Sequence, residues 1–193
     1  MNFDGVIFDM DGTLVEPLLD FEEIRRDLGV PVGVGILEDL QTRPARERTR
    51  LQARLLDYEM DAAHRARLLP GAAEITREAR AAGMRTALLT RNTRDAMEHV
   101  LETHGLEFDL CMAREDGPIK PEPDGVLAAC RELRIRPDRT LCVGDFEYEL
   151  IAARRAGAMS ALIVHEGSPR PGFAYRADYV IRRLDQLRGI LEL

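Results

Sequence analysis

Lysine is almost absent from this sequence of 193 residues. Its 27 basic side chains comprise 26 arginines and a single lysine, Lys120. Because arginine supplies the positive charge everywhere else, an individual arginine carries little information about function. A lysine differs from an arginine in presenting a compact, strongly hydrated point charge instead of a planar fork. We therefore expect Lys120 to have a chemical role.

An excess of positive charge is missing as well. The chain has 34 acidic and 27 basic side chains, which give a formal net charge of -7 and a pI near 5.2. Without a basic field, general binding to nucleic acid or to an anionic membrane is not expected. Hydrophobic residues make up 45% and charged residues 32% of the chain, a composition typical of globular proteins rather than disordered ones.

The sequence also lacks paired cysteines and long apolar runs. Its three cysteines, Cys111, Cys130 and Cys142, are odd in number, form no CxxC motif and have apolar neighbours, so we expect buried, reduced thiols. No apolar run approaches the roughly 18 residues that a membrane-spanning helix needs. The first residues contain acids and lack the basic segment of a signal peptide, and we expect a cytoplasmic location.

Short apolar runs alternate with segments of helical periodicity over most of the chain. Strands are predicted at residues 3–9, 84–90, 108–112, 140–143 and 160–164, and helices at 71–82, 94–104, 123–133 and 148–156. Parallel strands need a crossover connection, usually a helix, and helices then cover both faces of the sheet. The pattern predicts an α/β fold with a doubly wound parallel sheet.

Residues 14–69 interrupt this alternation with a charged, helical segment. Asp20 and Glu23 form a predicted capping box, a short helix is expected at 35–40, and Pro44 can begin a long helix. We expect a core of 1–13 and 70–193 with a cap of 14–69 over the carboxyl ends of the strands, where such sheets bind ligands. The alternative is a helical hairpin packed elsewhere. Acids interleave with the arginines of 43–54, which favours a solvated helix face over a protein-binding surface.

The densest chemical signal is Asp9-Met10-Asp11-Gly12-Thr13, directly after the first predicted strand. Residues at i and i+2 of an extended segment share a face, so Asp9 and Asp11 point to the same side. Two carboxylates this close repel each other unless a cation lies between them or one of them binds a proton. Carboxylate oxygens are hard ligands that suit Mg²⁺. Gly12 allows the chain to turn sharply after them.

Four further residues lie at ends of predicted strands or in nearby loops. Thr90 ends a strand, where its hydroxyl and the following backbone N–H groups could bind phosphate. Lys120 lies between prolines that restrict the loop 118–123. Asp145 follows another strand and is a candidate metal ligand, although it could instead cap the next helix. Glu149 lies one helical turn later and could hold Lys120 or a metal-bound water.

Together these residues resemble the haloacid dehalogenase-like (HAD) superfamily, subfamily IA, in its phosphoglycolate-phosphatase-like branch. The resemblance covers nearly the whole chain and depends on DMDGT at 9–13, Thr90, KPEP at 120–123 and VGDFEYE at 143–149. It implies a Rossmann-like core with a small helical cap of type 1. It also implies Asp9 as nucleophile, Asp11 as general acid and base, and Thr90 with Lys120 as phosphate-binding residues. Mg²⁺ would be bound by Asp9, Asp145 and the backbone carbonyl of Asp11.

Three positions depart from the pattern of the family. Phe146 stands where a small polar residue is frequent, and Glu149 stands where Asp is commoner. Arg91 follows Thr90 where Asn is frequent, and its guanidinium could bind a second anionic group of the substrate in a bidentate manner. These departures are expected to change the pocket without removing a metal ligand.

The second acid of the first motif favours a phosphatase over a dehalogenase. Cleavage of a phosphate ester needs a proton for the departing alkoxide, and Asp11 can supply it. We therefore expect a Mg²⁺-dependent enzyme that hydrolyses a small phosphate monoester through an aspartyl-phosphate on Asp9, with phosphoglycolate as the family-level candidate. A phosphomutase of the β-phosphoglucomutase type and a non-catalytic binding protein are the alternatives. The sequence makes no prediction of oligomeric state.

Overall fold

Six parallel strands form one sheet in the order β3-β2-β1-β4-β5-β6 in this computed structural model, which describes residues 3–193. The strands are β1 (Gly5–Phe8), β2 (Arg85–Leu89), β3 (Leu110–Met112), β4 (Thr140–Gly144), β5 (Met159–Ile163) and β6 (Tyr179–Ile181). The central strand β1 pairs on both sides, with Ile7 beside Ala87 of β2 and Cys142 of β4. The carboxyl ends of β1, β2 and β4 therefore meet at one edge of the sheet.

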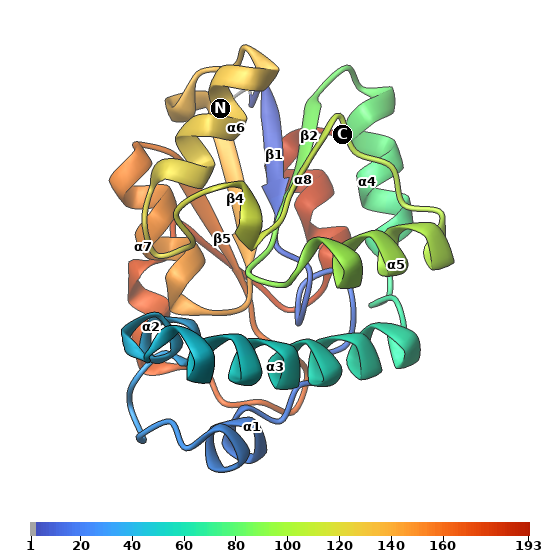
Figure 1. The fold of residues 1–193 in the computed structure, drawn as a ribbon. Helices are drawn as coiled ribbons and strands as arrows, with labels where there is room; N and C mark the ends of the chain where they lie inside the picture. Colours follow the sequence, from blue (N-terminus) through green and yellow to red (C-terminus); the bar gives the residue numbers. More distant parts are fainter. Residues whose placement is uncertain (1–2) are drawn as a thin grey trace.

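Helices cover both faces of the sheet (Figure 1). They are α4 (Ala72–Ala81), α5 (Arg94–His104), α6 (Asp124–Leu133), α7 (Glu147–Ala156) and α8 (Leu187–Leu191), with short 3-10 turns η1 (Arg114–Asp116), η2 (Pro137–Arg139), η3 (Gly172–Arg176) and η4 (Leu184–Gln186). Because side chains alternate along a strand, Val6 and Phe8 pack with α4, α5 and α8, whereas Ile7 packs with α6 and α7. The predicted doubly wound α/β core is confirmed.

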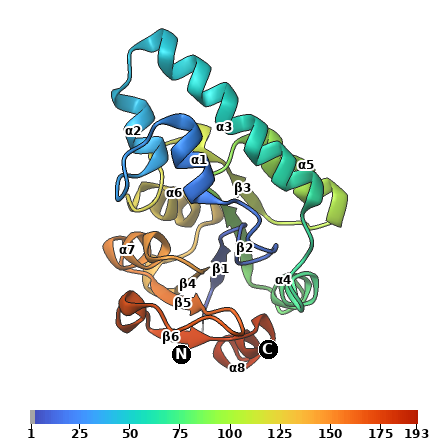
Figure 2. The same cartoon turned by 90° about the horizontal axis from the view of Figure 1, so that it is seen from below.

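Three more helices lie between β1 and α4: α1 (Phe21–Leu28), α2 (Ile36–Thr42) and α3 (Ala45–Arg65). They have an apolar core of their own that includes Ile24, Leu40 and Leu55. Figure 1 shows them beyond the carboxyl end of β1, and Figure 2 shows α3 running beside α5. The chain leaves and returns through neighbouring segments, since Val15 and Leu68 form an antiparallel bridge.

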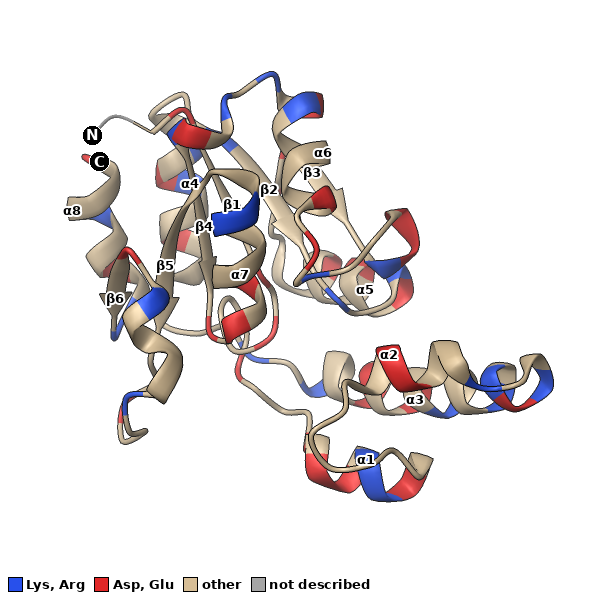
Figure 3. Cartoon of the chain, turned by 90° about the vertical axis from the view of Figure 1, so that its left-hand side faces the viewer, with Lys and Arg blue, Asp and Glu red and all other residues tan. Residues whose placement is uncertain are grey.

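These three helices, called the cap below, lie beyond the carboxyl edge of the sheet (Figure 1). That residues 14–69 behave as a separate domain remains a prediction, and the first two residues of the predicted core segment 1–13 lie outside the described residues. Figure 3 shows acidic and basic residues interspersed along α3. Ion pairs link Arg43 to Asp39 at 2.8 Å and Arg54 to Asp27 at 2.7 Å. Interspersed charges of both signs are typical of the solvated helix face that was predicted.

One strand, β6, and one α-helix, α8, were not predicted, and one cysteine is less buried than expected. β6 has three residues and α8 has five, too few for a periodic pattern to be recognised. Cys130 and Cys142 are buried and free as expected, but Cys111 is only half-buried because it lies on β3, the strand at the edge of the sheet. Among residues 3–193, no helix has the length and apolar character needed to cross a membrane.

Candidate active site

Asp9 and Asp11 lie immediately beyond the carboxyl end of β1. The backbone N–H of Asp9 donates to the carbonyl of Val143 at 2.9 Å, which continues the pairing of β1 with β4. Gly12 then turns the chain with a φ of 68°, and a Cβ at this position would collide with the carboxylate of Asp145. Glycine is therefore required both by the turn and by the close approach of the acidic group.

Lys120 joins three elements at the centre of the site. Its Nζ lies 2.6 Å from Oδ1 of Asp9 and 2.9 Å from Oε1 of Glu149, and it donates to the carbonyl of Leu89 at 2.8 Å. The side chain is 4% exposed. The ammonium group thus has three oxygen partners at distances of strong hydrogen bonds, and the lone lysine is a buried member of the site.

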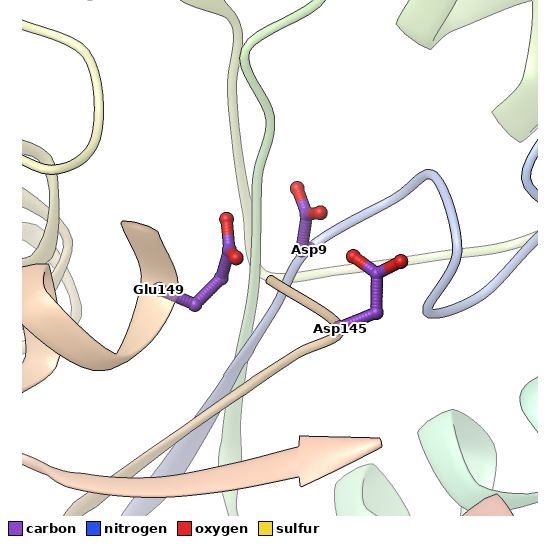
Figure 4. A group of neighbouring side chains, drawn as sticks. All are labelled: Asp9, Asp145 and Glu149. Carbon is purple, nitrogen blue, oxygen red and sulfur yellow. The ribbon is translucent and has the colours of Figure 1, made fainter. Parts of the chain in front are cut away.

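The carboxylates of Asp9, Asp145 and Glu149 lie close together (Figure 4). One oxygen from each of Asp9, Asp145 and Glu149 lies within 4.8 Å of the others. Asp145 follows β4 and does not cap α7, because the N-cap residue is Phe146. Gly144 lets α7 approach closely, since a Cβ there would collide with the side chain of Glu149. The three carboxylates form a set of hard oxygen donors that fits a divalent cation such as Mg²⁺.

Burial raises the pKa values of three acids at the site. Burial raises the pKa of Asp9 to about 8, against the opposing effect of Lys120. Burial, with the nearby charge of Glu59, raises the pKa of Asp11 to about 7, and burial also raises the pKa of Asp145. Although burial alone would lower it, the carboxylates of Asp9 and Glu149 raise the pKa of Lys120. One lysine does not compensate these acids, and a bound divalent cation would.

Thr90 and Asn92 follow β2 and line the same cavity as the acids. Thr90 follows β2, is 3% exposed, and its hydroxyl oxygen accepts a 3.1 Å hydrogen bond from the backbone N–H of Asn92. That bond leaves the O–H of Thr90 free to donate. The side-chain amide of Asn92 donates to Oδ2 of Asp11 at 2.7 Å. The structure thus brings Thr90 into the same site as Asp9 and Asp11.

Arg91 reaches from the core to the cap. Its Nη2 lies 2.8 Å from Oε1 of Glu38 on α2, and its Nη1 donates to the carbonyl of Lys120 at 2.5 Å. The guanidinium carbon lies 4.4 Å from the ring centroid of Tyr148. The predicted anion-binding arginine therefore lies at the site, but a cap carboxylate holds its guanidinium.

A cleft of about 320 Å³ opens between the core and the cap. Its polar lining includes the predicted residues Asp9, Asp11, Thr90, Arg91, Asp145 and Glu149, and its apolar lining includes Pro17, Leu19, Phe21, Ile36, Leu37, Leu55, Phe146 and Tyr148. Residues that are far apart in the sequence are thus gathered around one cavity, as the strand-end positions predicted.

Three residues at this site were not predicted as members of it. Asn92 contacts Asp11, and His165 lies 3.7 Å from Asp145. Glu59 is 3% exposed and pairs with Arg114 at 2.5 Å, which links α3 to η1. His165 follows a predicted strand, so its strand-end position was a usable signal. Glu59 falls four residues after Leu55 on the apolar stripe of α3, where an acid is unexpected.

The chain is similar in sequence to known proteins over most of its length. A family model for haloacid dehalogenase-like hydrolases matches residues 3–157. The chain is 28% identical to a haloacid dehalogenase-like hydrolase domain-containing protein of Arabidopsis thaliana, over 97% of this chain and 83% of that protein. It is 32% identical to a phosphoglycolate phosphatase of Cereibacter sphaeroides, over 82% and 84%.

A solved structure of β-phosphoglucomutase from Clostridium difficile has the same fold, with a TM-score of 0.79 at 18% identity over 98% of this chain and 96% of that one. At this identity the likeness concerns the fold alone. The similarity to a phosphoglycolate phosphatase agrees with the branch of the superfamily that the motifs indicated. Since the family model covers most of the sequence and includes DMDGT, KPEP and VGDFEYE, the chain belongs to the haloacid dehalogenase-like hydrolases.

Proposed function

We propose that this protein is a Mg²⁺-dependent phosphatase that hydrolyses a small phosphate monoester through an aspartyl-phosphate on Asp9. The observation that carries the proposal is the 2.6 Å contact between Nζ of Lys120 and Oδ1 of Asp9. A carboxylate nucleophile is repelled by a phosphate unless positive charge offsets both anions. The similarity to a phosphoglycolate phosphatase supports this class of substrate, and the composition favours a cytoplasmic enzyme.

In the first step, one carboxylate oxygen of Asp9 attacks phosphorus while the bond from phosphorus to the leaving oxygen breaks. Asp11 donates a proton to that oxygen, which departs as an alcohol. A pKa of about 7 for Asp11 supports this role, because a general acid works best with a pKa near the operating pH. The ammonium of Lys120 and the hydroxyl of Thr90 would stabilise negative charge on the phosphoryl oxygens.

In the second step, a water molecule attacks phosphorus of the acyl phosphate. Asp11, now a carboxylate, accepts the proton of the water, and the bond between phosphorus and Asp9 breaks. Inorganic phosphate leaves, and Asp9 returns to its starting state. The 2.7 Å hydrogen bond from Asn92 would hold Asp11 in one orientation for both proton transfers.

Asp9 and Asp145, with the backbone carbonyl of Asp11, would hold Mg²⁺. Bound there, the ion would supply positive charge that offsets the charges of the carboxylates and of the phosphate. Glu149 belongs to the same carboxylate cluster, and its 2.9 Å contact with Lys120 favours a role in holding the ammonium. This assignment keeps one partner for Lys120 when Asp9 forms a bond to phosphorus.

Substitution of the nucleophile tests the proposal. Asp9→Asn should abolish phosphate release from p-nitrophenyl phosphate without loss of the folded structure, measured by circular dichroism. Asp4→Asn is a matched control, because Asp4 lies before the opposite end of β1 and pairs with Arg139 at 2.9 Å. Undiminished turnover by Asp9→Asn would refute the nucleophile, and activity that survives exhaustive EDTA treatment would refute the metal.

The same assay separates the alternatives. A phosphomutase would retain the phosphoryl group until a second substrate hydroxyl arrives, which requires exclusion of water. Rapid release of inorganic phosphate without a sugar-phosphate acceptor therefore supports the phosphatase. A non-catalytic binding protein would release no phosphate. The presence of Asp9, Lys120 and Asp145 in this chain argues against that alternative, since a non-catalytic protein is expected to lack one of them.

A further inference from the structure

Aromatic side chains gather at the entrance of the cleft. The chain has only six phenylalanines and four tyrosines, and no tryptophan. Three of these aromatic residues line the cleft: Phe21 from α1 of the cap, and Phe146 and Tyr148 from the start of α7. A residue type that is scarce in the chain thus lies on both walls of the cavity that contains Asp9.

Two of these rings are much more exposed than aromatic rings in a protein core. Phe146 is 46% exposed and Phe21 is 54% exposed. A single exposed apolar residue is ordinary on a protein surface, but apolar surface concentrated in a concave site is typical of ligand binding. Phe21 and Phe146 line opposite walls of one cleft, so they offer apolar area to whatever fills it.

Neighbouring aromatic rings hold Phe146 in a fixed orientation. Tyr148 lies edge-on at 4.9 Å between ring centroids, and Phe173 lies at 5.6 Å. Tyr148 is itself covered by the guanidinium of Arg91. Edge-on pairs of this kind are favourable contacts, and Phe146 remains 46% exposed while it lines the cleft. Phe146 is therefore a preorganised apolar platform.

The rest of the lining points to the same kind of occupant. Besides polar residues that include Arg25 and Glu59, the lining contains the apolar side chains of Pro17, Leu19, Ile36, Leu37 and Leu55. The volume of about 320 Å³ lies at the lower end of the range of roughly 300 to 1,000 Å³ found for small-molecule sites. A small, doubly anionic substrate would leave these apolar walls unused.

We infer that the alcohol released from the substrate carries a flat aromatic ring, as in a nucleoside 5′-monophosphate, and that this ring stacks on Phe146 between the core and the cap. The inference rests on the proposed phosphatase function and specifies its substrate class. In this arrangement the phosphate lies beside Asp9 and Lys120, and the ring lies at the entrance beside Phe146 and Phe21. Stacking on an aromatic side chain accepts any base, because every base has a π face.

A pair of substrates with the same reacting bond tests the inference. In ribose 5-phosphate and in the common nucleoside 5′-monophosphates, the phosphate is bound to the same primary oxygen of the ribose. The two substrates therefore differ in the base and not in the leaving oxygen. We expect kcat/KM for the best nucleotide to exceed that for ribose 5-phosphate by roughly tenfold or more, the effect of one stacked base. If no nucleotide is hydrolysed better than ribose 5-phosphate, the inference is wrong.

Variants locate the effect. Phe146→Ala should raise the KM for the nucleotide by roughly tenfold more than it raises the KM for ribose 5-phosphate, and Phe146→Tyr should retain the wild-type KM for both. Tyr175→Ala is the matched control, because Tyr175 is an aromatic residue that is 75% exposed and does not line the cleft. An equal loss on both substrates in Phe146→Ala would show that the ring only closes the cleft, which would overturn the inference.

The outcome is separable from a failure of the proposed function. Hydrolysis of p-nitrophenyl phosphate or ribose 5-phosphate that depends on Asp9 supports the phosphatase whether or not nucleotides are preferred. Absence of phosphate release from every ester, together with absence of a thermal shift on addition of nucleotide, overturns both. Nucleotide binding without hydrolysis, detected as a thermal shift that Phe146→Ala abolishes, would support the aromatic site and contradict the phosphatase.

Discussion

The side-chain amide of Asn92 donates a 2.7 Å hydrogen bond to Oδ2 of Asp11, and the backbone N–H of the same residue donates to the hydroxyl of Thr90. Asn92 is buried and lies two residues beyond Thr90, whereas Asp11 lies in the loop after β1. One residue, through its side chain and its backbone, therefore fixes the orientation of the proposed general acid relative to the proposed phosphate-binding residue. An amide bonded to a single oxygen also leaves the other carboxyl oxygen available to exchange a proton.

Asn92→Ala should impair the cleavage of poor leaving groups more than that of good ones. An alkyl phosphate needs protonation of its leaving oxygen, whereas p-nitrophenolate departs as a stable anion. Since a positioned general acid contributes about 10²- to 10⁴-fold, we expect kcat for glycerol phosphate to fall by about 10- to 100-fold, with a much smaller decrease for p-nitrophenyl phosphate. Equal losses on the two substrates would show that Asn92 does not act through Asp11.

This site could be predicted from the sequence because most of its residues lie at the ends of strands. Asp9, Thr90 and Asp145 each follow an apolar run, and parallel strands bring their carboxyl ends to one edge. Asn92 gave no separate signal, because it is neither charged nor on a strand. Its contact with Asp11 depends on the turn after Thr90, which periodicity does not describe.

The relation between cap and core was the least predictable part of the structure. The capping box at Asp20 and the position of Pro44 predicted α1 and α3, and a short helix was expected at 35–40, because such signals belong to each helix alone. The angle at which a helix docks depends on side chains of two elements together. The pairing of Arg91 with Glu38 and the burial of Glu59 beside Arg114 therefore could not be read from spacing.

Lys120→Arg should cause a severe loss of activity although it conserves the charge. The ammonium has oxygen partners on Asp9, Glu149 and Leu89 at 2.6 to 2.9 Å, in surroundings that leave 4% of the side chain exposed. A guanidinium is wider, planar and directs its donors along fixed axes. We expect kcat/KM to fall by about 10²- to 10³-fold, a size typical of removing one preorganised stabilising group.

The Lys120 variant needs a control for folding, because overpacking a core typically costs about 1 to 3 kcal/mol. Lys120→Met keeps the length of the side chain and removes the charge, so it reports the loss of the ammonium with less steric change. Both variants should be inactive while their circular dichroism spectra remain native. Near-normal kcat/KM in Lys120→Arg would mean that any cation suffices at this position.

The pair formed by Arg91 and Glu38 should affect substrate affinity more than stability. It connects the core to α2 at 2.8 Å, but Glu38 is 42% exposed, and ion pairs at such positions contribute about 0 to 1 kcal/mol. Glu38→Gln and Arg91→Gln should each raise KM a few-fold with little change in Tm, because the cap is held less closely over the cleft. If the pair acts as a unit, the effect on KM in the double variant will be smaller than the product of the two single effects.

Phosphoglycolate distinguishes this pairing from the anion-binding role that the sequence suggested for Arg91. A guanidinium that binds the carboxylate of the substrate must exchange Glu38 for it, so Glu38→Gln would then lower the KM for phosphoglycolate while Arg91→Gln would raise it. Opposite changes on phosphoglycolate alone would favour substrate binding. Parallel increases on all substrates would favour a contact that only holds the cap.

Mg²⁺ should stabilise the protein, and more strongly at pH 8 than at pH 6. Burial raises the pKa of Asp9 to about 8 and that of Asp11 to about 7, so without metal the folded state retains protons that the unfolded chain loses near pH 4. Stability of the metal-free form therefore falls as pH rises toward 8. Because a cation must displace these protons, its apparent affinity should rise with pH, by roughly tenfold per unit for each proton released.

The measurement is the shift of Tm on titration with Mg²⁺ at the two pH values, which needs no substrate. Asp145→Asn should abolish the shift, since it removes one of the three clustered carboxylates. Asp4→Asn should retain it, because Asp4 lies before the amino end of β1 and pairs with Arg139. A shift that is equal at pH 6 and pH 8 would show that Mg²⁺ does not compete with protons at Asp9, and a shift retained by Asp145→Asn would place the ion elsewhere.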